Sequence, residues 1–141
     1  MSLKVFIDSD VIISSLISTT GAAFYLIHQI DTIDSLVSNN SVDEIEKVIE
    51  RLSLNAREFK KLIGNKVSVI EMQQTINEVK KQYATYVLDI NDAHIVAGAV
   101  KGKVRFLVSY NIKHFKADKL KEDFGIILIT PANLLQYIRS I

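Results

Sequence analysis

Short apolar stretches alternate with segments of helical periodicity along almost the whole chain, and this alternation most restricts its fold. Five stretches have the length and the β-branched residues of strands, at residues 4–7, 35–37, 67–70, 104–108 and 126–129. Strands that alternate with helices are typical of a mostly parallel sheet with helices on its faces. The sequence therefore predicts the α/β class.

Helical periodicity fills the segments between these stretches. Apolar side chains recur every three or four residues in two of them, at Val42, Ile45, Ile49 and Leu52 and at Ile76, Val79, Tyr83 and Val87. Residues 93–100 have scarcely any polar face, so we expect a buried helix whose small residues approach the sheet closely. Pro131 indicates the first turn of a last helix, with an inner stripe of Leu134, Leu135, Ile138 and Ile141. We expect the charged residues 55–64 to form an arm or a lid.

Length and composition limit the architecture further. The 141 residues are 48% hydrophobic, which fits one compact domain over residues 1–141. Cysteine is absent from the sequence, which excludes disulfides, thiolate nucleophiles and cysteine-bound zinc. No stretch approaches the roughly 20 apolar residues that span a bilayer, and the N-terminal residues do not resemble a signal peptide. We therefore expect a cytoplasmic protein with no membrane segment.

Three apolar stretches run directly into polar residues. The first leads into Asp8, Ser9 and Asp10, another into residues 89–92, and a third into Ser109, Tyr110 and Asn111. If the first and third are parallel strands of one sheet, their ends meet at the edge where open α/β folds bind ligands. Carboxylates gathered there repel one another unless a cation lies between them. A metal site is the leading hypothesis.

Each of these polar residues also has a structural explanation. Asp8 and Asp10 could cap the helix that follows the first strand. Residues 41–44 match a capping box, in which Ser41 bonds forward and Glu44 reaches back. Asp92 in a first helical turn would favour the helix dipole, and residue 111 could belong to an ordinary turn. The argument for a functional site therefore rests on their convergence.

The ordered set of motifs resembles the PIN domain family of nucleases. It comprises an apolar strand ending in Asp8, the helix start at residues 41–44, an Asn91-Asp92 pair that opens an alanine-rich helix, and residues 106–115. The resemblance covers essentially the whole chain, and residues 91–115 are similar to the form found in PIN-type toxins of toxin–antitoxin pairs. It implies a three-layer α/β/α sandwich with a metal-dependent ribonuclease site.

The resemblance also implies roles for individual residues. Asp8, Glu44 and Asp92 would form the acidic core that binds Mg²⁺ or Mn²⁺, with Asn111 in the fourth place and Ser109 supporting it. Asp10 stands where the family often has Asn, and Asn111 where many relatives have Asp. Asp43 precedes Glu44, so which of the two carboxylates faces the site is open.

Basic residues concentrate near the third motif although the formal net charge is only +1. Seven Lys or Arg residues and His114 lie within residues 101–121, against Asp118 alone. Phosphate contacts of this kind bind nucleic acid with little base information. We expect Lys101, Lys103, Lys113, His114 and Lys116 to bind the RNA backbone, and Tyr110 could stack on an unpaired base. The expected partners are RNA, single-stranded by preference, an antitoxin protein and a second copy in a homodimer.

Two other functions remain open at this stage. The strand leading into Asp8 and Asp10 also resembles the first motif of haloacid dehalogenase-like phosphatases, with Asp8 as nucleophile. No Gly-Asp pair with a further Asp follows Ser109, and the chain is short for that family. The other alternative is a PIN-like domain that binds RNA or protein without cleaving.

Overall fold

The computed structural model describes residues 2–141. Its sheet has five strands in the order β3-β2-β1-β4-β5, and every neighbouring pair is parallel. The strands are β1 (Leu3–Ile7), β2 (Ile33–Ser38), β3 (Val67–Ile70), β4 (Phe106–Val108) and β5 (Ile127–Ile129). The predicted α/β class and the five strand positions are confirmed.

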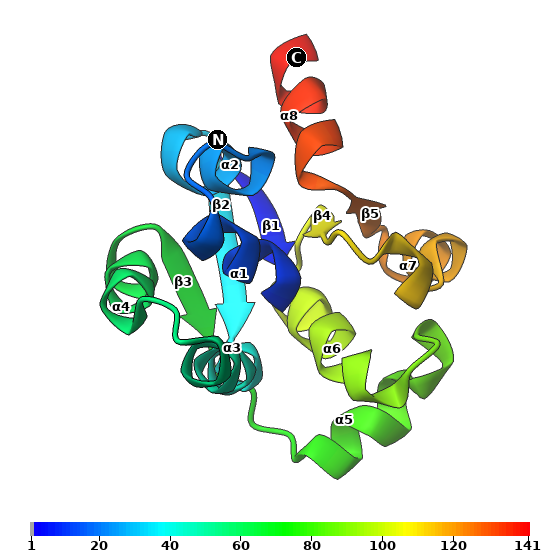
Figure 1. Ribbon diagram of the computed structural model, residues 1–141. Coiled ribbons are helices and arrows are strands. Elements are labelled where there is room, and N and C mark those ends of the chain that lie inside the picture. The colour runs from blue at the N-terminus through cyan, green and yellow to red at the C-terminus, as the bar shows by residue number, and fades with distance from the viewer. Residues whose placement is uncertain (1) are drawn as a thin grey trace.

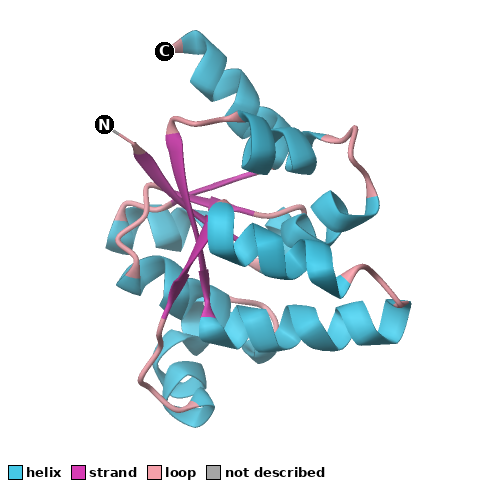
Figure 2. Ribbon diagram, turned by 90° about the vertical axis from the view of Figure 1, so that its left-hand side faces the viewer, coloured by secondary structure: helices cyan, strands magenta, loops and turns pink. Residues whose placement is uncertain are grey.

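Helices cover both faces of this sheet (Figures 1 and 2). One face packs against α1 (Ser9–Ile17), α2 (Ala22–Gln29), α3 (Asn39–Leu52), α4 (Ala56–Asn65) and α8 (Pro131–Ser140). The other packs against α5 (Ile76–Tyr83), α6 (Ala93–Lys101) and α7 (Ala117–Phe124). The expected three-layer α/β/α sandwich is confirmed.

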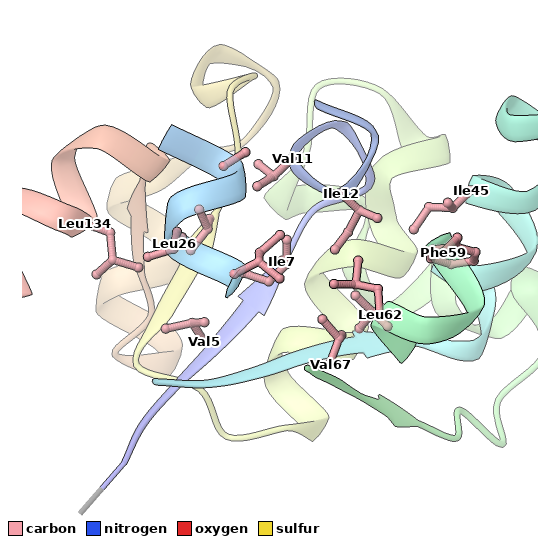
Figure 3. Packing of buried hydrophobic residues seen from close by; sticks show 14 of the residues in the cluster. Val5, Ile7, Val11, Ile12, Leu26, Ile45, Phe59, Leu62, Val67 and Leu134 are labelled. Carbon is pink, nitrogen blue, oxygen red and sulfur yellow. The ribbon is translucent and has the colours of Figure 1, made fainter. Parts of the chain in front are cut away.

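Alternate side chains of the central strand enter two separate hydrophobic cores. Val5 and Ile7 of β1 belong to the core under α1 and α2, which Figure 3 shows from close by, whereas Phe6 belongs to the core under α6. All three are fully buried. Strands buried on both faces are nearly continuous in hydrophobicity, which explains why these stretches were recognisable in the sequence.

The strand order reverses beside β1, and this determines where polar strand ends gather. From β1 the chain moves outward to β2 and β3, then returns to place β4 on the other side of β1. Such a reversal opens a crevice at the carboxyl ends of the two strands, where open α/β sheets bind ligands. Asp8 follows β1 and Ser109 follows β4, so both residues lie at this crevice.

Gly98 lets α6 lie directly on the sheet. A Cβ built at Gly98 would lie 2.5 Å from the ring of Phe6, which is completely buried. A larger residue would have to displace either that ring or the helix. The expected close approach of a buried, small-residue helix is therefore present, and it keeps Asp92, at the N-terminus of α6, near β1.

Two local predictions are wrong. The helix α3 begins at Asn39 and is capped by Ser38, whose hydroxyl accepts from the Ser41 amide at 3.1 Å, so residues 41–44 are not a capping box. Residues 55–64 form neither an arm nor a lid, because Phe59 and Leu62 of α4 bury themselves in the first core. In both cases the packing of the helix on the sheet, rather than local charge, decides.

The apolar stripes were also drawn slightly too long. Leu52 and Ile141 are exposed, and Val87 follows α5 and its 3₁₀ turn (Ala84–Tyr86), in an isolated bridge to Phe115.

Within residues 2–141 no single helix has both the length and the apolar character needed to cross a membrane. Only α1 and α2 taken together have that length and apolar character, and a bend of 96° separates them.

Candidate active site

Asp8 is the most buried carboxylate at the carboxyl end of the sheet. It follows β1 and caps α1, and only 8% of its surface is exposed. Its Oδ1 accepts from the Ser9 amide and its Oδ2 from the Ser109 hydroxyl, each at 2.7 Å. Burial, and then the charge of Asp10, raise the pKa of Asp8 to about 7 in spite of these bonds. A group in this state is stabilised in its charged form by a nearby cation.

Asp10 ties the loop after β4 to the start of α1. Its Oδ2 accepts from the Tyr110 amide and from the Asn111 side-chain amide, each at 3.0 Å, and from the Ser109 hydroxyl at 3.4 Å. Its Oδ1 is buried without a hydrogen-bond partner among the described residues. Burial raises the pKa of Asp10 as well. Asn111 is thus held at the end of β4 by its side-chain amide, which donates to Asp10.

Glu44 reaches the same region from α3. Because the helix starts at Asn39, its carboxylate takes no part in capping and instead lies 3.1 Å from Nε2 of His94. This contact lowers the pKa of Glu44, whereas burial raises that pKa. The nearby Ser9 hydroxyl also lowers the pKa, although its geometry does not make a hydrogen bond. Asp43 and Glu44 are both exposed on this helix. Of the two carboxylates, Glu44 contacts the buried histidine.

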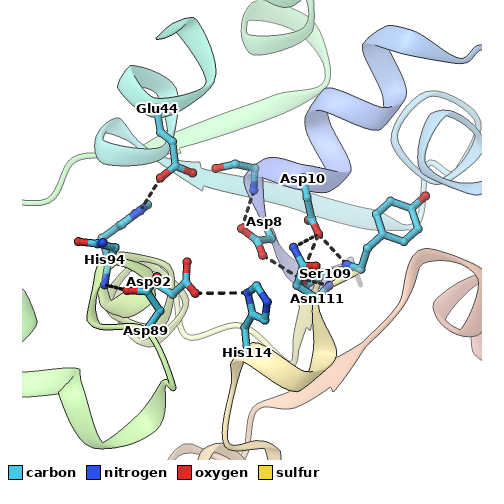
Figure 4. A network of polar contacts seen from close by, with 12 residues as sticks. Asp8, Asp10, Glu44, Asp89, Asp92, His94, Ser109, Asn111 and His114 are labelled. Carbon is cyan, nitrogen blue, oxygen red and sulfur yellow. Dashed lines mark hydrogen bonds and ion pairs between the residues drawn. The ribbon is translucent and has the colours of Figure 1, made fainter. Parts of the chain in front are cut away.

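Asp92 occupies the N-cap of α6 but makes no capping hydrogen bond. Its Oδ2 lies 3.6 Å from Nδ1 of His114, and its carboxylate points toward the space between Glu44 and Asp8 (Figure 4). Burial and the charge of Asp89 raise the pKa of Asp92, and Glu44 also raises it. Asp92 in turn raises the pKa of Asp8. The carboxylates from β1, α3 and α6 therefore share one electrostatic site.

All five residues that the sequence predicts as catalytic lie in this region. The structure brings together Asp8, Glu44, Asp92, Ser109 and Asn111 (Figure 4). Sequence reasoning missed two supporting contacts, the Asp10 network and the bond from His94 to Glu44. Asp10 was signalled by its place two residues after Asp8, whereas nothing in the sequence connects residues 44 and 94.

His94 is a buried side chain with only one of its two ring nitrogens in contact with a partner among residues 2–141. His94 is 9% exposed, its Nε2 contacts Glu44, and its Nδ1 is buried without a partner in the part of the chain that the structure describes. His114, by contrast, is half exposed beside Asp92, as expected for a residue facing solvent or phosphate.

The predicted basic set divides into two groups. Lys113, His114 and Lys116 follow β4, and of these three His114 contacts Asp92. Lys101 lies at the other end of α6, a helix roughly 13 Å long at 1.5 Å per residue, and its ammonium group donates to the Glu71 carbonyl. Lys103 lines a pocket with residues at the amino-terminal ends of β4 and β5. The structure does not bring Lys101 and Lys103 to the acidic site.

The donors at this site suit a hard divalent cation. They are carboxylate, hydroxyl and amide oxygens, which Mg²⁺ and Mn²⁺ prefer. The raised pKa values of Asp8, Asp10 and Asp92, together with the unpartnered Oδ1 of Asp10, indicate negative charge that no Lys or Arg in residues 2–141 pairs with. Over the same residues no group of three or more Asp, Glu, His or Cys side chains has the geometry of a complete metal-binding site. A divalent ion at this site would therefore be held by one or two of the carboxylates together with water.

Comparison with known proteins gives the family. The family model of the PIN domain matches residues 4–113, and the chain belongs to the PIN domain family. A comparison with curated proteins found no match.

Solved structures share the fold at low sequence identity. A toxin–antitoxin complex from Klebsiella pneumoniae aligns with a TM-score of 0.64 and 19% identity over 90% of this chain and 97% of that one. VapBC2 from Rickettsia felis, bound to a DNA fragment from its promoter, aligns with a TM-score of 0.64 and 12% identity over 91% of this chain and 98% of that one. FitAB bound to a DNA fragment aligns with a TM-score of 0.56 and 14% identity over 90% of this chain and 94% of that one. At these identities the likeness supports the fold.

Proposed function

We propose that this PIN domain is a metal-dependent ribonuclease that hydrolyses RNA phosphodiester bonds, and that it acts as the toxin of a toxin–antitoxin pair. The observation that carries the proposal is the buried Asp8, whose two oxygens are fixed by Ser9 and Ser109 beside the carboxylate of Asp92. Such a cluster of carboxylates is costly unless a cation lies between them. The nuclease chemistry follows from the family and from these oxygens.

Asp8 and Asp92 would hold a Mg²⁺ or Mn²⁺ ion, with Glu44 as a third, more distant ligand. The chemistry that such an ion supplies when bound is a lowered pKa for water at the site and neutralisation of charge on the phosphate. Ser109 restrains Asp8 through its hydrogen bond, and Asn111 restrains Asp10. These residues preorganise the oxygens, so binding requires little rearrangement of β1 and β4.

The proposed role of Glu44 is to orient the attacking water. The contact with His94 lowers the pKa of Glu44, so its carboxylate remains ionised and can accept a hydrogen bond from water. The oxygen of a water molecule forms a bond to phosphorus while the bond from phosphorus to one ribose oxygen breaks. One proton of that water ends on the leaving ribose oxygen, and the other stays with the new phosphate group. Lys113, His114 and Lys116 would contact the neighbouring phosphates of a single-stranded RNA.

The partners of the proposed toxin are an antitoxin protein and a second copy of the chain. The structures similar to it include toxin–antitoxin complexes, two of them bound to DNA. Their alignment extends over at least 90% of this chain, so the likeness of fold that supports these partners covers nearly all of it.

Cleavage assays test the proposal directly. Purified protein is incubated with single-stranded RNA and, separately, with a small phosphomonoester, in Mn²⁺ or in EDTA. We expect RNA cleavage in Mn²⁺ only, abolished in Asp8→Asn and Asp92→Asn proteins that fold normally by circular dichroism. Asp34→Asn, in the first half of β2 and away from the site, is the matched control and should cleave normally.

Two results would contradict the proposal. Turnover of the phosphomonoester without RNA cleavage would support a phosphatase that uses Asp8 as nucleophile. Binding of RNA without cleavage of any substrate would support a PIN domain that only binds.

A further inference from the structure

A groove leads away from the acidic site between α3 and α5. It encloses about 420 Å³, within the range of about 300–1,000 Å³ typical of small-ligand sites. Glu44 and His94 line one part of it, together with Asn91, which directly precedes Asp92. The groove is therefore continuous with the site where the scissile phosphate would lie.

Two lysines from different helices line this groove. Lys47 of α3 lies one helical turn beyond Glu44 and helps to lower the pKa of that carboxylate, which indicates that the two side chains are near each other. Lys80 of α5 faces it across the groove. Neither lysine forms an ion pair with any side chain in residues 2–141. Their positive charge is available to an anionic ligand.

The remaining lining groups suit a nucleotide. Asn40 and Asn91 offer amides, and the Asn40 Nδ2 is buried without a hydrogen-bond partner among the described residues. Ile76 is an exposed apolar side chain in the same lining, 44% accessible, on which a ribose or base could pack. A polar edge, an apolar patch and two cations are the groups that a nucleotide of an unpaired strand requires.

We propose that this groove is a binding subsite for single-stranded RNA, in which Lys47 and Lys80 hold the phosphate and Asn40 and Asn91 hold the base of a nucleotide that flanks the cleaved bond. The proposal rests on the proposed ribonuclease function and extends it to the substrate path. The strand would pass from this groove across Asp8 and Asp92 toward Lys113 and Lys116. The groove thus supplies the cations that Lys101 and Lys103, remote from the site, do not.

Binding rather than cleavage tests this subsite, so its failure and that of the nuclease are distinguishable. The affinity for a fluorescent oligoribonucleotide is measured in EDTA at several salt concentrations, for the native protein and for Lys47→Gln/Lys80→Gln. Each phosphate contact to a single strand contributes about 0.7 to the slope of log affinity against log salt. We expect the double variant to lose about 1.4 of that slope.

The matched control removes two lysines at the amino-terminal edge of the sheet. Lys4→Gln/Lys103→Gln removes the same charge, and its slope should equal that of the native protein. Equal losses in both double variants would mean that only net charge matters, and no loss in Lys47→Gln/Lys80→Gln would mean that RNA does not enter the groove. Either result overturns the proposal.

Asp43 provides a test of opposite sign. It lines the same groove and is exposed, so its carboxylate repels a polyanion bound there. Asp43→Asn should therefore tighten RNA binding, whereas Asp31→Asn, which removes an exposed carboxylate from the turn between α2 and β2, should not. Unchanged or weaker RNA binding in Asp43→Asn would mean that no polyanion lies beside this carboxylate, and would overturn the RNA assignment.

Discussion

The two halves of the acidic site hold their carboxylates by different means. At the ends of β1 and β4, Asp8 and Asp10 accept from hydroxyl and amide donors on adjacent strands and loops. Across the site, Glu44 and Asp92 each lie beside a histidine, His94 or His114. The first half, which we call the rigid half because several hydrogen bonds restrain it, contains the deeply buried Asp8. The second, which we call the adaptable half, is more exposed to solvent. In the proposed nuclease, the first half would fix the position of the metal and the second would adapt to the substrate.

The largest expected difference is in how the two halves couple folding to pH. Because the pKa of Asp8 is raised from 3.8 to about 7, the folded protein binds more protons than the unfolded chain between those values. The free energy of unfolding therefore falls as pH rises through that range in the absence of metal. Asp8→Asn should remove much of this slope and raise stability at pH 7 by roughly 2–4 kcal/mol. Urea unfolding in EDTA from pH 4 to pH 8 measures it.

Asp92→Asn is the matched variant from the adaptable half. The side chain of Asp92 is 30% exposed and its pKa is also raised, so the same sign is expected with a smaller amplitude. Equal slopes in the two variants would contradict the division of the site into a buried and an adaptable half.

A smaller effect tests the rigid half from within. Asn111→Asp places a second carboxylate against Asp10 and should destabilise the protein by about 1–3 kcal/mol at pH 7, because like charges meet in a partly buried loop. Adding Asp10→Asn restores a single negative charge and should recover part of this loss. Thermal unfolding of both single variants and the double variant measures the coupling. Additive effects would mean that residues 10 and 111 act independently.

The smallest effect concerns His94 in the adaptable half. His94→Leu removes the contact that lowers the pKa of Glu44, so that pKa should rise. A carboxyl group with a lowered pKa in the folded protein stabilises the fold at pH values above its ordinary pKa, and this contribution disappears as pH falls. The variant lacks the contribution, so its stability should fall less steeply in acid. His94→Gln keeps an N–H donor and should retain most of the shift.

The readout for these His94 variants is the NMR titration of the Glu44 side chain. His114→Gln is the control, because His114 contacts Asp92 instead. An unchanged titration of Glu44 in His94→Leu would show that the 3.1 Å contact does not persist in solution.

The local patterns that succeeded and those that failed have a common explanation. Strands buried on both faces and the nearly apolar α6 were recognisable because one period and one composition extend over each whole element. The helix start at residues 41–44 failed because Ser38, held at the end of β2, caps α3 three residues earlier. The charged residues 55–64 were misread because Phe59 and Leu62, two apolar side chains among many polar ones, are enough to anchor α4.

The sequence by itself determined the strands, the parallel α/β class and the residues that end β1 and β4, because these depend on periodicity and on short-range order along the chain. Only the tertiary structure decided that Glu44 pairs with His94, that Asn111 bonds Asp10, and that Lys47 and Lys80 replace Lys101 and Lys103 beside the acidic site. The physical reason is distance. A helix of nine residues is roughly 13 Å long, so Lys101 at the end of α6 lies far from the site although it is close in sequence to the third motif. Lys47 and Lys80 are 33 positions apart in sequence but line one groove.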